Sequence, residues 1–456
     1  MSSLQKTLSF IKHRAIESKI ISWSLDYPNP KREPLFENDN IVLRGWILFK
    51  RKTLSESPCI YIPYSEFVDR KVILDKARPD VIEAIFGKKD NKNPQHHCGF
   101  NINIPCSQKK INIRIRVAEK DYLLKKVDLS EYLKRHTENN KLKVLQGING
   151  WLFLDNDTNY SVDQHCGNLI LKKNCLENWQ AYINELTTIS NDKMKKCAFL
   201  ITPSKEEVMD RYHPYPKAET SLLKPILEKI PQHLLVYPLN ELKELGDAAF
   251  LKTDTHWTHQ GAKTAAISVA NKLKLPEDDI LTLLSSDKYT QRKHVGDLGN
   301  KLAEPQSATS NFLSSFSFRN WVVYDNALPN FGRIIVTHYP KALTNSTCLI
   351  FGSSSSYSMF NYFCRFFSNM IFIHTAGNID TSLITAISPN YLITQTNARF
   401  MIRPPVADYD VDQTIRDKIN LLSEEQLTIQ KKNVIIRDLE MIRALGLERW
   451  HNIISC

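Results

Sequence analysis

Apolar and polar residues alternate in short runs from residue 40 to about residue 130. In Asn101-Ile102-Asn103-Ile104, and again over residues 111–115, every second residue is apolar, which is typical of half-buried antiparallel strands. Similar runs, separated by polar turns, continue through the region: IVLRGWILFK, SPCIYIPY, RKVIL, FNINIP and KINIRIRVAE. Residues 1–135 are therefore predicted to form a β-rich, sandwich-like domain.

The pattern changes after about residue 147. Short apolar runs then alternate with longer segments of helical period, such as LENWQAYINELTTI and GAKTAAISVANKL, which predicts an α/β domain with a parallel sheet and crossover helices over residues 136–405. The apolar runs cover residues 197–202, 234–239, 347–352, 370–374 and 391–395. After Pro404-Pro405 the chain becomes polar, and its apolar spacing predicts a C-terminal helical extension over residues 406–456.

The composition of the 456-residue chain is that of an ordinary globular protein, and the length indicates more than one domain. No apolar run approaches the roughly 20 residues of a membrane span, and the polar, basic N-terminus lacks the apolar core of a signal peptide. The sequence therefore predicts a cytoplasmic protein, either free or at the inner face of the membrane. Nine cysteines without a CxxC pair are interpreted as reduced thiols, and no metal site is predicted.

The net charge of +11 favours anionic partners. The positive charges are scattered, and no nucleic-acid-binding motif is present. An acidic glycan or an anionic membrane surface therefore fits better than nucleic acid. The pattern does not indicate an oligomeric state.

The segment Lys252–Thr258 contains an aspartate and a histidine two positions apart. In an extended segment Asp254 and His256 point to the same side, so the carboxylate can fix the imidazole tautomer and leave Nε2 free as a base. Thr258 is predicted to cap the helix that follows, which places His256 at a strand-to-helix junction. Taken alone, such a pair is more often a surface Asp-x-His beside a core tryptophan, here Trp257.

A run of four serines follows the apolar segment at 347–352. A serine on a turn after a buried strand is lifted to the carboxyl end of the sheet, where backbone N–H groups can stabilise an oxyanion. Taken alone, the run more often indicates a loop with capping serines. A phosphate-binding turn is a third interpretation, but no Walker lysine is present.

Together the two motifs resemble the SGNH-hydrolase-like domain of the alginate O-acetyltransferase family and related capsule-modifying proteins, in which an Asp-x-His-Trp motif precedes the serine turn. The resemblance covers roughly residues 145–405. It includes further short matches: Gly147-x-x-Gly150-Trp151-Leu152-Phe153, Pro203 and Lys205, Tyr212 and Pro214, Gly296-Asp297-Leu298, Arg399-Phe400 and Pro404-Pro405.

The resemblance implies a role for each residue of the two motifs. By position, Ser354 matches the nucleophile, His256 the base and Asp254 the orienting acid. Many family members have Gly-Asp-Ser or Gly-Thr-Ser at the turn, whereas this chain has Gly352-Ser353-Ser354. Ser353 and Ser355 therefore stay open as minor alternatives for the nucleophile.

Three other residues are candidates for substrate binding. Lys205, near the end of a core strand, could bind an anionic substrate or be an ordinary surface lysine. Arg399 could contact the site or pair with a carboxylate. Trp257 could serve as a sugar platform, although a core position is more common for such a residue.

The implied activity is that of a bacterial O-acetyltransferase that modifies a capsular or other cell-surface polysaccharide through an acetyl-serine intermediate. No bound cofactor is expected, and acetyl-CoA is the expected donor if the protein is cytosolic. A carbohydrate esterase with the same triad is one alternative, and a non-catalytic glycan-binding scaffold is another. The β-rich domain is either a carbohydrate-binding module, on a faint likeness at Arg44-Gly45-Trp46, Arg78-Pro79-Asp80-Val81 and Cys98-Gly99-Phe100, or a spacer.

Overall fold

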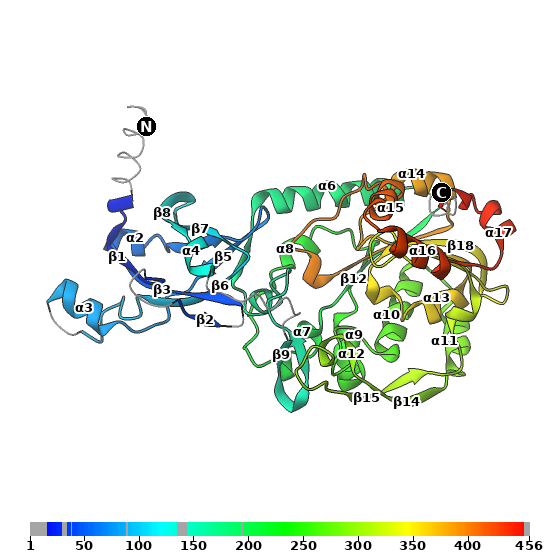
Figure 1. Ribbon diagram of the computed structural model, residues 1–456, viewed down its shortest axis with the longest axis horizontal. Coiled ribbons are helices and arrows are strands. Elements are labelled where there is room, and N and C mark those ends of the chain that lie inside the picture. Colours follow the sequence, from blue (N-terminus) through cyan, green and yellow to red (C-terminus); the bar gives the residue numbers. More distant parts are fainter. Residues whose placement is uncertain are drawn as a thin grey trace. The chain divides into compact units, whose positions relative to one another are not determined.

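The computed structural model of the protein describes residues 16–29, 34–37, 39–87, 90–134, 144–192 and 195–450. The chain divides into two compact units (Figure 1). Unit 1 comprises Met1–Lys141 and Asn168–Lys172, and unit 2 comprises Leu142–Gly167 and Lys173–Cys456. The N-terminus, on which the prediction of no signal peptide rests, the predicted boundary at residues 135/136, and Cys456 all lie outside the described residues.

Unit 1 contains two antiparallel sheets, in agreement with the period-two pattern of its sequence. One sheet pairs β3 with three strands, which are β1, β2 and β6. In the other sheet, the apolar positions of β7 (Ile111, Ile113 and Ile115) are buried while the residues between them are more exposed. The bounds are β1 Ile20–Tyr27, β2 Phe36–Glu37, β3 Asn40–Phe49, β4 Cys59–Pro63, β5 Val68–Val72, β6 Gly99–Pro105, β7 Lys110–Val117, β8 Lys120–Asp128 and β11 Leu169–Leu171, with helices α2 Arg51–Leu54, α3 Pro79–Phe86 and α4 Ser130–Leu133.

Strand β11 reaches unit 1 from a distant part of the sequence. It pairs antiparallel with β5 at one end of the order β11-β5-β4-β7-β8. The Lys172 ammonium then lies 3.3 Å from Asp69 and donates to the Ser65 carbonyl at 2.6 Å. The sequence pattern did not predict this strand, because three residues are too few to show a period.

Unit 2 is built on an eight-stranded sheet in the order β13-β12-β20-β18-β19-β17-β16-β21. The first five strands are parallel, as predicted, and each of the five apolar runs contains one of them. The last three strands are antiparallel and were not predicted. The bounds are β12 Lys196–Thr202, β13 Leu235–Val236, β16 Val322–Asp325, β17 Ile334–His338, β18 Thr344–Gly352, β19 Phe367–His374, β20 Tyr391–Asn397 and β21 Ile435–Ile436.

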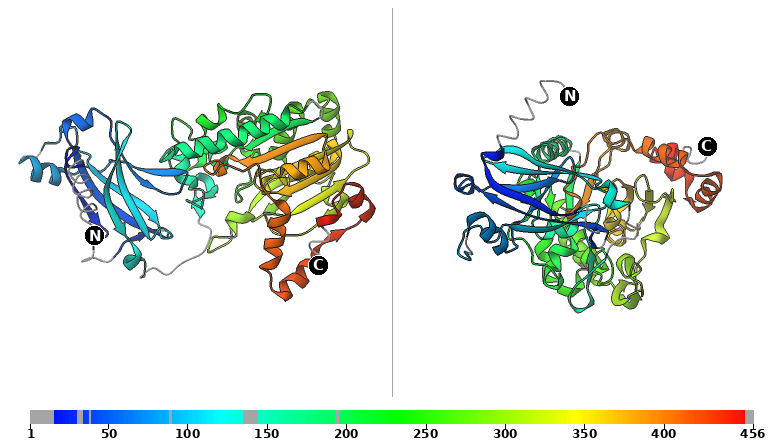
Figure 2. Two further views of the ribbon diagram at one scale, coloured as in Figure 1. Left: turned by 90° about the horizontal axis from the view of Figure 1, so that it is seen from above. Right: turned by 60° about the vertical axis from the view of Figure 1, so that its left-hand side comes forward.

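Helices cover both faces of this sheet (Figures 1 and 2). On one face, Trp179 and Tyr182 of α6 (Lys173–Ser190) pack on Phe199 of β12. On the other face, α10 (His259–Lys272) and α13 (Phe360–Phe366) share a core with the strands. Thr258 caps α10 by accepting a hydrogen bond from the Gly261 N–H at 3.0 Å, which confirms that prediction. The α/β fold class is likewise confirmed.

Shorter elements complete unit 2. Two hairpins lie outside the main sheet, β9 (Val144–Gln146) with β10 (Leu152–Leu154) and β14 (Tyr289–His294) with β15 (Ala308–Leu313). The remaining helices are α5 Ser161–His165, α7 Lys205–Val208, α8 Lys224–Leu227, α9 Leu239–Glu244, α11 Glu277–Ser285, α12 Gly296–Gly299, α14 Thr381–Ile387, α15 Val411–Asn420, α16 Glu424–Asn433 and α17 Leu439–Ala444. The 3-10 turns are η1 Ile148–Gly150, η2 Asp210–Tyr212, η3 Gly246–Ala248, η4 Phe318–Trp321, η5 Ser354–Ser356 and η6 Ala398–Phe400.

The C-terminal region is helical apart from one short strand. Helices α15, α16 and α17 fall within residues 406–456, and β21 extends the main sheet by pairing with β16. Trp450 is fully buried, and its indole donates to Asp412 at 2.8 Å. Among the described residues, no helix combines the length and apolar character of a membrane span, and the eight cysteines are free thiols.

Candidate active site

The serine run follows the buried strand β18, whose residues Cys348 to Phe351 are fully buried. Strand β18 ends at Gly352, and the chain then turns through η5. Of the four serines only Ser354 is not buried. Its Oγ lies 2.9 Å from His256 Nε2, although the two residues are 98 positions apart in the sequence. The turn therefore presents one serine hydroxyl to the imidazole.

A buried glutamine on β20 engages two of the other serines. Gln395 Oε1 accepts from the Ser353 N–H at 2.7 Å and from the Ser353 and Ser356 hydroxyls at 3.0 Å each. The Gln395 amide in turn donates to Thr202 and Asn397, so the ends of β12, β20 and β18 are held together. This network leaves Ser354 as the hydroxyl that faces His256, and Ser353 is engaged elsewhere.

Asp254 and His256 lie on a bent loop, and the predicted extended strand at this position is wrong. The loop is closed at its base by a bridge between Phe250 and Trp257 and by a hydrogen bond from the Leu251 N–H to the His256 carbonyl. Asp254 Oδ1 accepts from both the backbone N–H of His256, at 2.9 Å, and its Nδ1, at 2.7 Å. The carboxylate therefore orients the imidazole through a local turn, and side-chain alternation along a strand plays no part.

Two residues that the sequence did not identify as site residues complete the surroundings of Asp254. His294, at the end of β14, donates from Nε2 to Asp254 Oδ2 at 3.0 Å, and the Asp297 N–H donates to the same oxygen at 3.1 Å. Burial raises the pKa of Asp254, but its hydrogen bonds to His256 and His294 outweigh burial and hold the pKa well below its usual range. Asp254 is therefore a carboxylate at neutral pH.

The Gly296-Asp297-Leu298 triplet was a signal that could have located Asp297. Gly296 has a φ of +73°, and a Cβ at this position would lie 2.3 Å from the Thr253 carbonyl oxygen. Only glycine allows the chain to pass so close to the Asp254 loop. Asp297 then accepts hydrogen bonds from the N–H and the hydroxyl of Thr255, which fixes the Asp254 loop in place.

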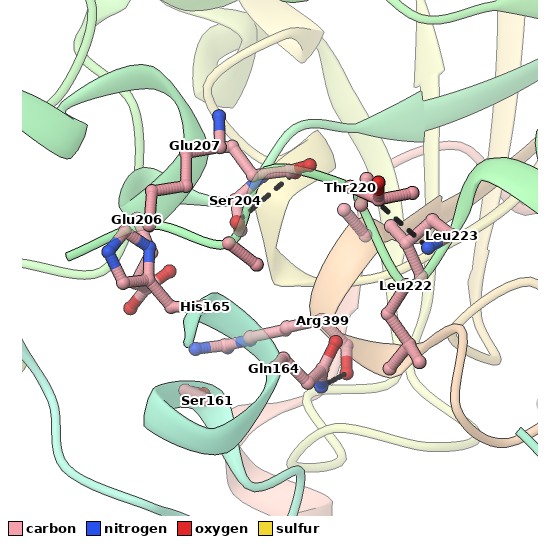
Figure 3. Close-up of a pocket in the computed structure, with 14 residues that line it drawn as sticks. Ser161, Gln164, His165, Ser204, Glu206, Glu207, Thr220, Leu222, Leu223 and Arg399 are labelled. Atoms are coloured by element: carbon pink, nitrogen blue, oxygen red, sulfur yellow. Dashed lines mark hydrogen bonds between the residues drawn. The ribbon is translucent and has the colours of Figure 1, made fainter. Parts of the chain in front are cut away.

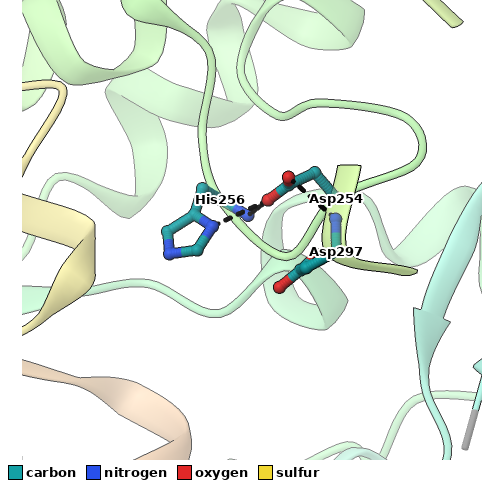
Figure 4. A group of neighbouring side chains, drawn as sticks. All are labelled: Asp254, His256 and Asp297. Atoms are coloured by element: carbon teal, nitrogen blue, oxygen red, sulfur yellow. Dashed lines mark hydrogen bonds and ion pairs between the residues drawn. The ribbon is translucent and has the colours of Figure 1, made fainter. Parts of the chain in front are cut away.

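Asp254, His256 and Asp297 offer ligand atoms within 4.8 Å of one another, a spacing that could hold a metal ion (Figure 4). All four carboxylate oxygens, however, accept hydrogen bonds from N–H or O–H groups: His256, His294 and Asp297 for Asp254, and Thr255 for Asp297. Each carboxylate oxygen that could bind a cation therefore already accepts at least one hydrogen bond. The cluster therefore fits a hydrogen-bonded orienting network better than a metal site.

Lys205 is not placed to bind substrate, which corrects the prediction from its sequence position. The side chain is 4% exposed, and its ammonium donates to the carbonyls of Leu251, Lys252 and Asp254 at 2.7, 3.0 and 2.9 Å. An ammonium has three donors, so all are used. Burial lowers the pKa of Lys205 to about 7. Lys205, the first residue of α7, therefore supports the Asp254 loop.

Trp257 is also a structural residue, and the prediction of a sugar platform is corrected. Its side chain is 2% exposed. The indole N–H donates to the Ser355 carbonyl and to the Ser358 hydroxyl at 2.9 Å each. Trp257 therefore joins the His256 loop to the serine turn. This explains how two motifs that are far apart in sequence keep their relative positions.

Arg399 lines a pocket, and its role in substrate binding stays a prediction. The pocket is bounded by α5, the start of α7 and η6, and Arg399 reaches across it toward the helix of Ser161 and Gln164 (Figure 3). A second, adjoining pocket shares Ser204, Glu206 and Arg399 with it and also includes Ser355 and Asn397. Burial raises the pKa of Glu206. The two pockets connect Arg399 to the serine turn.

Comparisons with known proteins bear on this arrangement. Residues 144–313 match the family model described as an SGNH hydrolase-like domain of the acetyltransferase AlgX, a range that contains Asp254 and His256 and ends before Ser354. A search of curated proteins found no match.

Several solved structures are similar to part of the chain. PatB1 of Bacillus cereus has 15% identity and a TM-score of 0.42, covering 55% of this chain and 96% of its own. A DHHW family protein from Eubacterium siraeum has 15% identity and a TM-score of 0.41, covering 62% and 99%. The O-acetyltransferase domain of Pseudomonas putida AlgJ has 13% identity and a TM-score of 0.36, covering 61% and 99%. It is the family-model match that confirms the resemblance predicted from the sequence, over residues 144–313, where the chain matches the SGNH hydrolase-like domain of the acetyltransferase AlgX.

Proposed function

We propose that the protein is an O-acetyltransferase that moves an acetyl group to a hydroxyl of a capsular or other cell-surface polysaccharide. The observation that carries the proposal is the hydrogen-bonded series from Ser354 Oγ through both ring nitrogens of His256 to Asp254. A serine hydroxyl is a weak nucleophile at neutral pH until a base accepts its proton. The match to an acetyltransferase domain supports the choice of acetyl as the acyl group.

In the proposed reaction, His256 acts twice. Because Nδ1 faces the Asp254 carboxylate, it carries the proton, and Nε2 is free to accept the proton of Ser354 as Oγ attacks the acetyl carbonyl. The protonated imidazole then gives that proton to the leaving group of the donor, which yields acetyl-Ser354. In the second half, Nε2 accepts the proton of a sugar hydroxyl that attacks the acetyl-serine, and the proton returns to Ser354 as the ester forms.

The negative oxygen of each tetrahedral intermediate needs a donor. The Ser353 N–H donates to Gln395 of β20, the Ser356 N–H donates to the Ser353 carbonyl, and the Ser355 N–H lies 3.4 Å from Ser353 Oγ. Ser354 opens η5, and the first N–H of a helical turn has no partner inside it. We therefore assign the Ser354 N–H as one oxyanion donor. The amide of Asn397 lines the adjoining pocket and is the side-chain candidate for a second.

The donor and acceptor follow from the predicted location and charge. For a cytoplasmic enzyme, free or at the inner membrane face, acetyl-CoA is the donor we propose, with no cofactor bound permanently. The net charge of +11 favours an acidic polysaccharide as acceptor. Unit 1 would then serve as the glycan-binding module.

The direct test is to incubate the full chain with acetyl-CoA and candidate capsule polymers and to follow acetylation by mass spectrometry. Ser354→Ala should abolish transfer while leaving the circular dichroism spectrum unchanged, because it removes one hydroxyl from a turn. Ser286→Ala, at an exposed serine on the surface of unit 2, is the matched control and should keep full activity. A sulfonyl fluoride should label Ser354 in the parent chain and fail to do so in His256→Ala.

Three results would change the proposal. Release of acetate without acetylated polymer would favour the esterase. Polymer binding without acetyl uptake or labelling would favour the glycan-binding scaffold. Full activity in Ser354→Ala would contradict the assignment of the nucleophile.

A further inference from the structure

A third cavity lies in unit 2, apart from the two pockets around Arg399. Its volume is about 880 Å³, within the range of small-molecule sites. Four arginines line it, Arg292, Arg319, Arg333 and Arg437, together with a single carboxylate, Asp325. This arginine pocket takes no part in the mechanism described above.

The charge of the pocket is only partly neutralised. Asp325 pairs with Arg333 at 2.8 Å, and Arg437 donates to the backbone carbonyls of residues 319 and 320. Among the described residues, no carboxylate forms an ion pair with Arg292, Arg319 or Arg437. Three guanidinium groups are therefore left to attract an anion, and guanidinium matches carboxylate and phosphate in both charge and geometry.

Each triad residue is connected to the pocket through a neighbour in the chain or in space. The pocket residues His259 and Tyr357 follow the base and the nucleophile by three positions. The ring of Phe312 lies 5.3 Å from that of His259 and 5.7 Å from that of His294, which hydrogen-bonds Asp254. Asp254, His256 and Ser354 do not line the pocket themselves, and these neighbouring residues link them to it on the side of the β14–β15 hairpin.

The other lining groups suit an organic ligand. Phe312, Phe316, Phe318 and Tyr357 give the pocket aromatic walls. His259 Nδ1 accepts from the Leu313 N–H at 3.0 Å, so in the neutral ring Nε2 carries the proton and can donate. Burial lowers the pKa of His259, which keeps that ring neutral.

We propose that the arginine pocket binds the anionic groups of the substrate whose acetyl group or hydroxyl meets Ser354. This inference rests on the proposed function. Carboxylate and phosphate share the required chemistry, so the ligand is either the phosphate-bearing part of a coenzyme A donor or the carboxylates of an acidic glycan acceptor. In either case, binding here fixes the substrate relative to the serine turn.

The test is direct binding to the full chain carrying Ser354→Ala, which cannot turn over, by isothermal titration at low salt. The two probes are coenzyme A, compared with 3′-dephospho-coenzyme A, and an oligogalacturonate, compared with a neutral oligosaccharide of the same length. Replacing Arg292 and Arg319 together by Gln should weaken binding of the anionic probe by about 10- to 100-fold. Both are exposed, so folding should be retained.

The control pair is Lys293→Gln with Lys301→Gln, which removes the same charge at exposed positions outside the pocket. It should change the affinity less than about twofold. Loss of coenzyme A binding assigns the pocket to the donor, and loss of oligogalacturonate binding assigns it to the acceptor. Equal losses in both variant pairs, or no binding of either anion to the parent, would overturn the inference.

Acyl labelling of Ser354 in the parent chain separates this inference from the proposed function. Labelling without anion binding contradicts only the arginine pocket. Anion binding that is lost in Arg292→Gln with Arg319→Gln, in a parent chain that takes up no acetyl group, contradicts only the acetyltransferase.

Discussion

Replacing Lys205 by Met tests whether this lysine supports the loop or binds substrate. Methionine keeps much of the side-chain volume among Trp151 and Phe153, which lie about 5 Å from the ammonium. It removes all three hydrogen bonds to the Asp254 loop. The Lys252 carbonyl keeps a second donor, the Leu152 N–H at 3.0 Å.

The loss in folding free energy can be worked out from the two carbonyls that lose their donor. Leu251 and Asp254 would each have a buried carbonyl without a strong donor, at about 1–3 kcal/mol apiece. Removing a buried charge offsets part of this loss. We expect the free energy of unfolding to fall by about 2–3 kcal/mol. A shift of about 1 Å in Asp254 and His256 should lower kcat by about 100-fold and leave KM nearly unchanged.

The assay is steady-state acetyl transfer at a temperature where urea unfolding shows Lys205→Met to be fully folded. Lys301→Met, at an exposed lysine, is the matched control and should match the parent chain in both stability and rate. A raised KM for an anionic substrate with an unchanged kcat would refute this reasoning, because that pattern indicates that the ammonium contacts substrate.

Three further variants probe other residues of unit 2. Asp254→Asn should lower kcat by more than about 1,000-fold without unfolding, because an amide favours the wrong imidazole tautomer; a smaller loss in initial-rate assays would remove Asp254 from the triad. Trp257→Phe should lower kcat about tenfold through loss of the indole hydrogen bonds, and a change confined to the KM for sugar would instead restore the sugar platform. Burial, followed by the charge of His165, lowers the pKa of His213 from 6.5 to about 4, so the unfolded chain binds the proton first as pH falls. The stability that neutral His213 contributes is therefore present above pH 6.5, and the free energy of unfolding should fall by about 3 kcal/mol between pH 6.5 and 4. In His213→Phe, the free energy of unfolding measured with urea should depend less on pH over that range. An unchanged pH dependence would count against the assignment.

The parallel half of the α/β sheet could be predicted because its strands are buried on both faces and therefore appear as continuous apolar runs. The antiparallel half could not. Strand β14, which lies in a hairpin outside this sheet and carries His294, was not predicted either, because it is mostly exposed and its sequence YTQRKH shows no apolar period. Its position beside Asp254 follows from tertiary packing, so the second histidine of the site was missed.

The sequence predicted that Asp254, His256 and Ser354 lie together, whereas the way they meet could not be predicted. An Asp-x-His pair gives the same side-chain proximity from an extended strand and from a tight turn. Here the turn is also held by Asp297, which bonds Thr255 and Asp254 from 42 and 43 positions away. For Lys205 and Trp257 the residue type was informative, but burial decided their roles. Burial depends on what the rest of the chain packs around a side chain, and no local pattern reports it.

Residues 168–172, which supply the edge strand β11 of unit 1, determine when unit 1 can be completed during synthesis of the chain. A ribosome releases the N-terminal strands first, yet the sheet of unit 1 lacks its β11 edge until residue 172 has emerged. By then β9, β10 and α5 of unit 2 have already been synthesised. Unit 1 therefore carries an open strand edge at β5 during synthesis, and its completion waits for a part of the chain that continues directly into α6. Truncation after residue 141 would make that transient state permanent, so an isolated N-terminal fragment is expected to aggregate through β5 unless residues 168–172 are supplied.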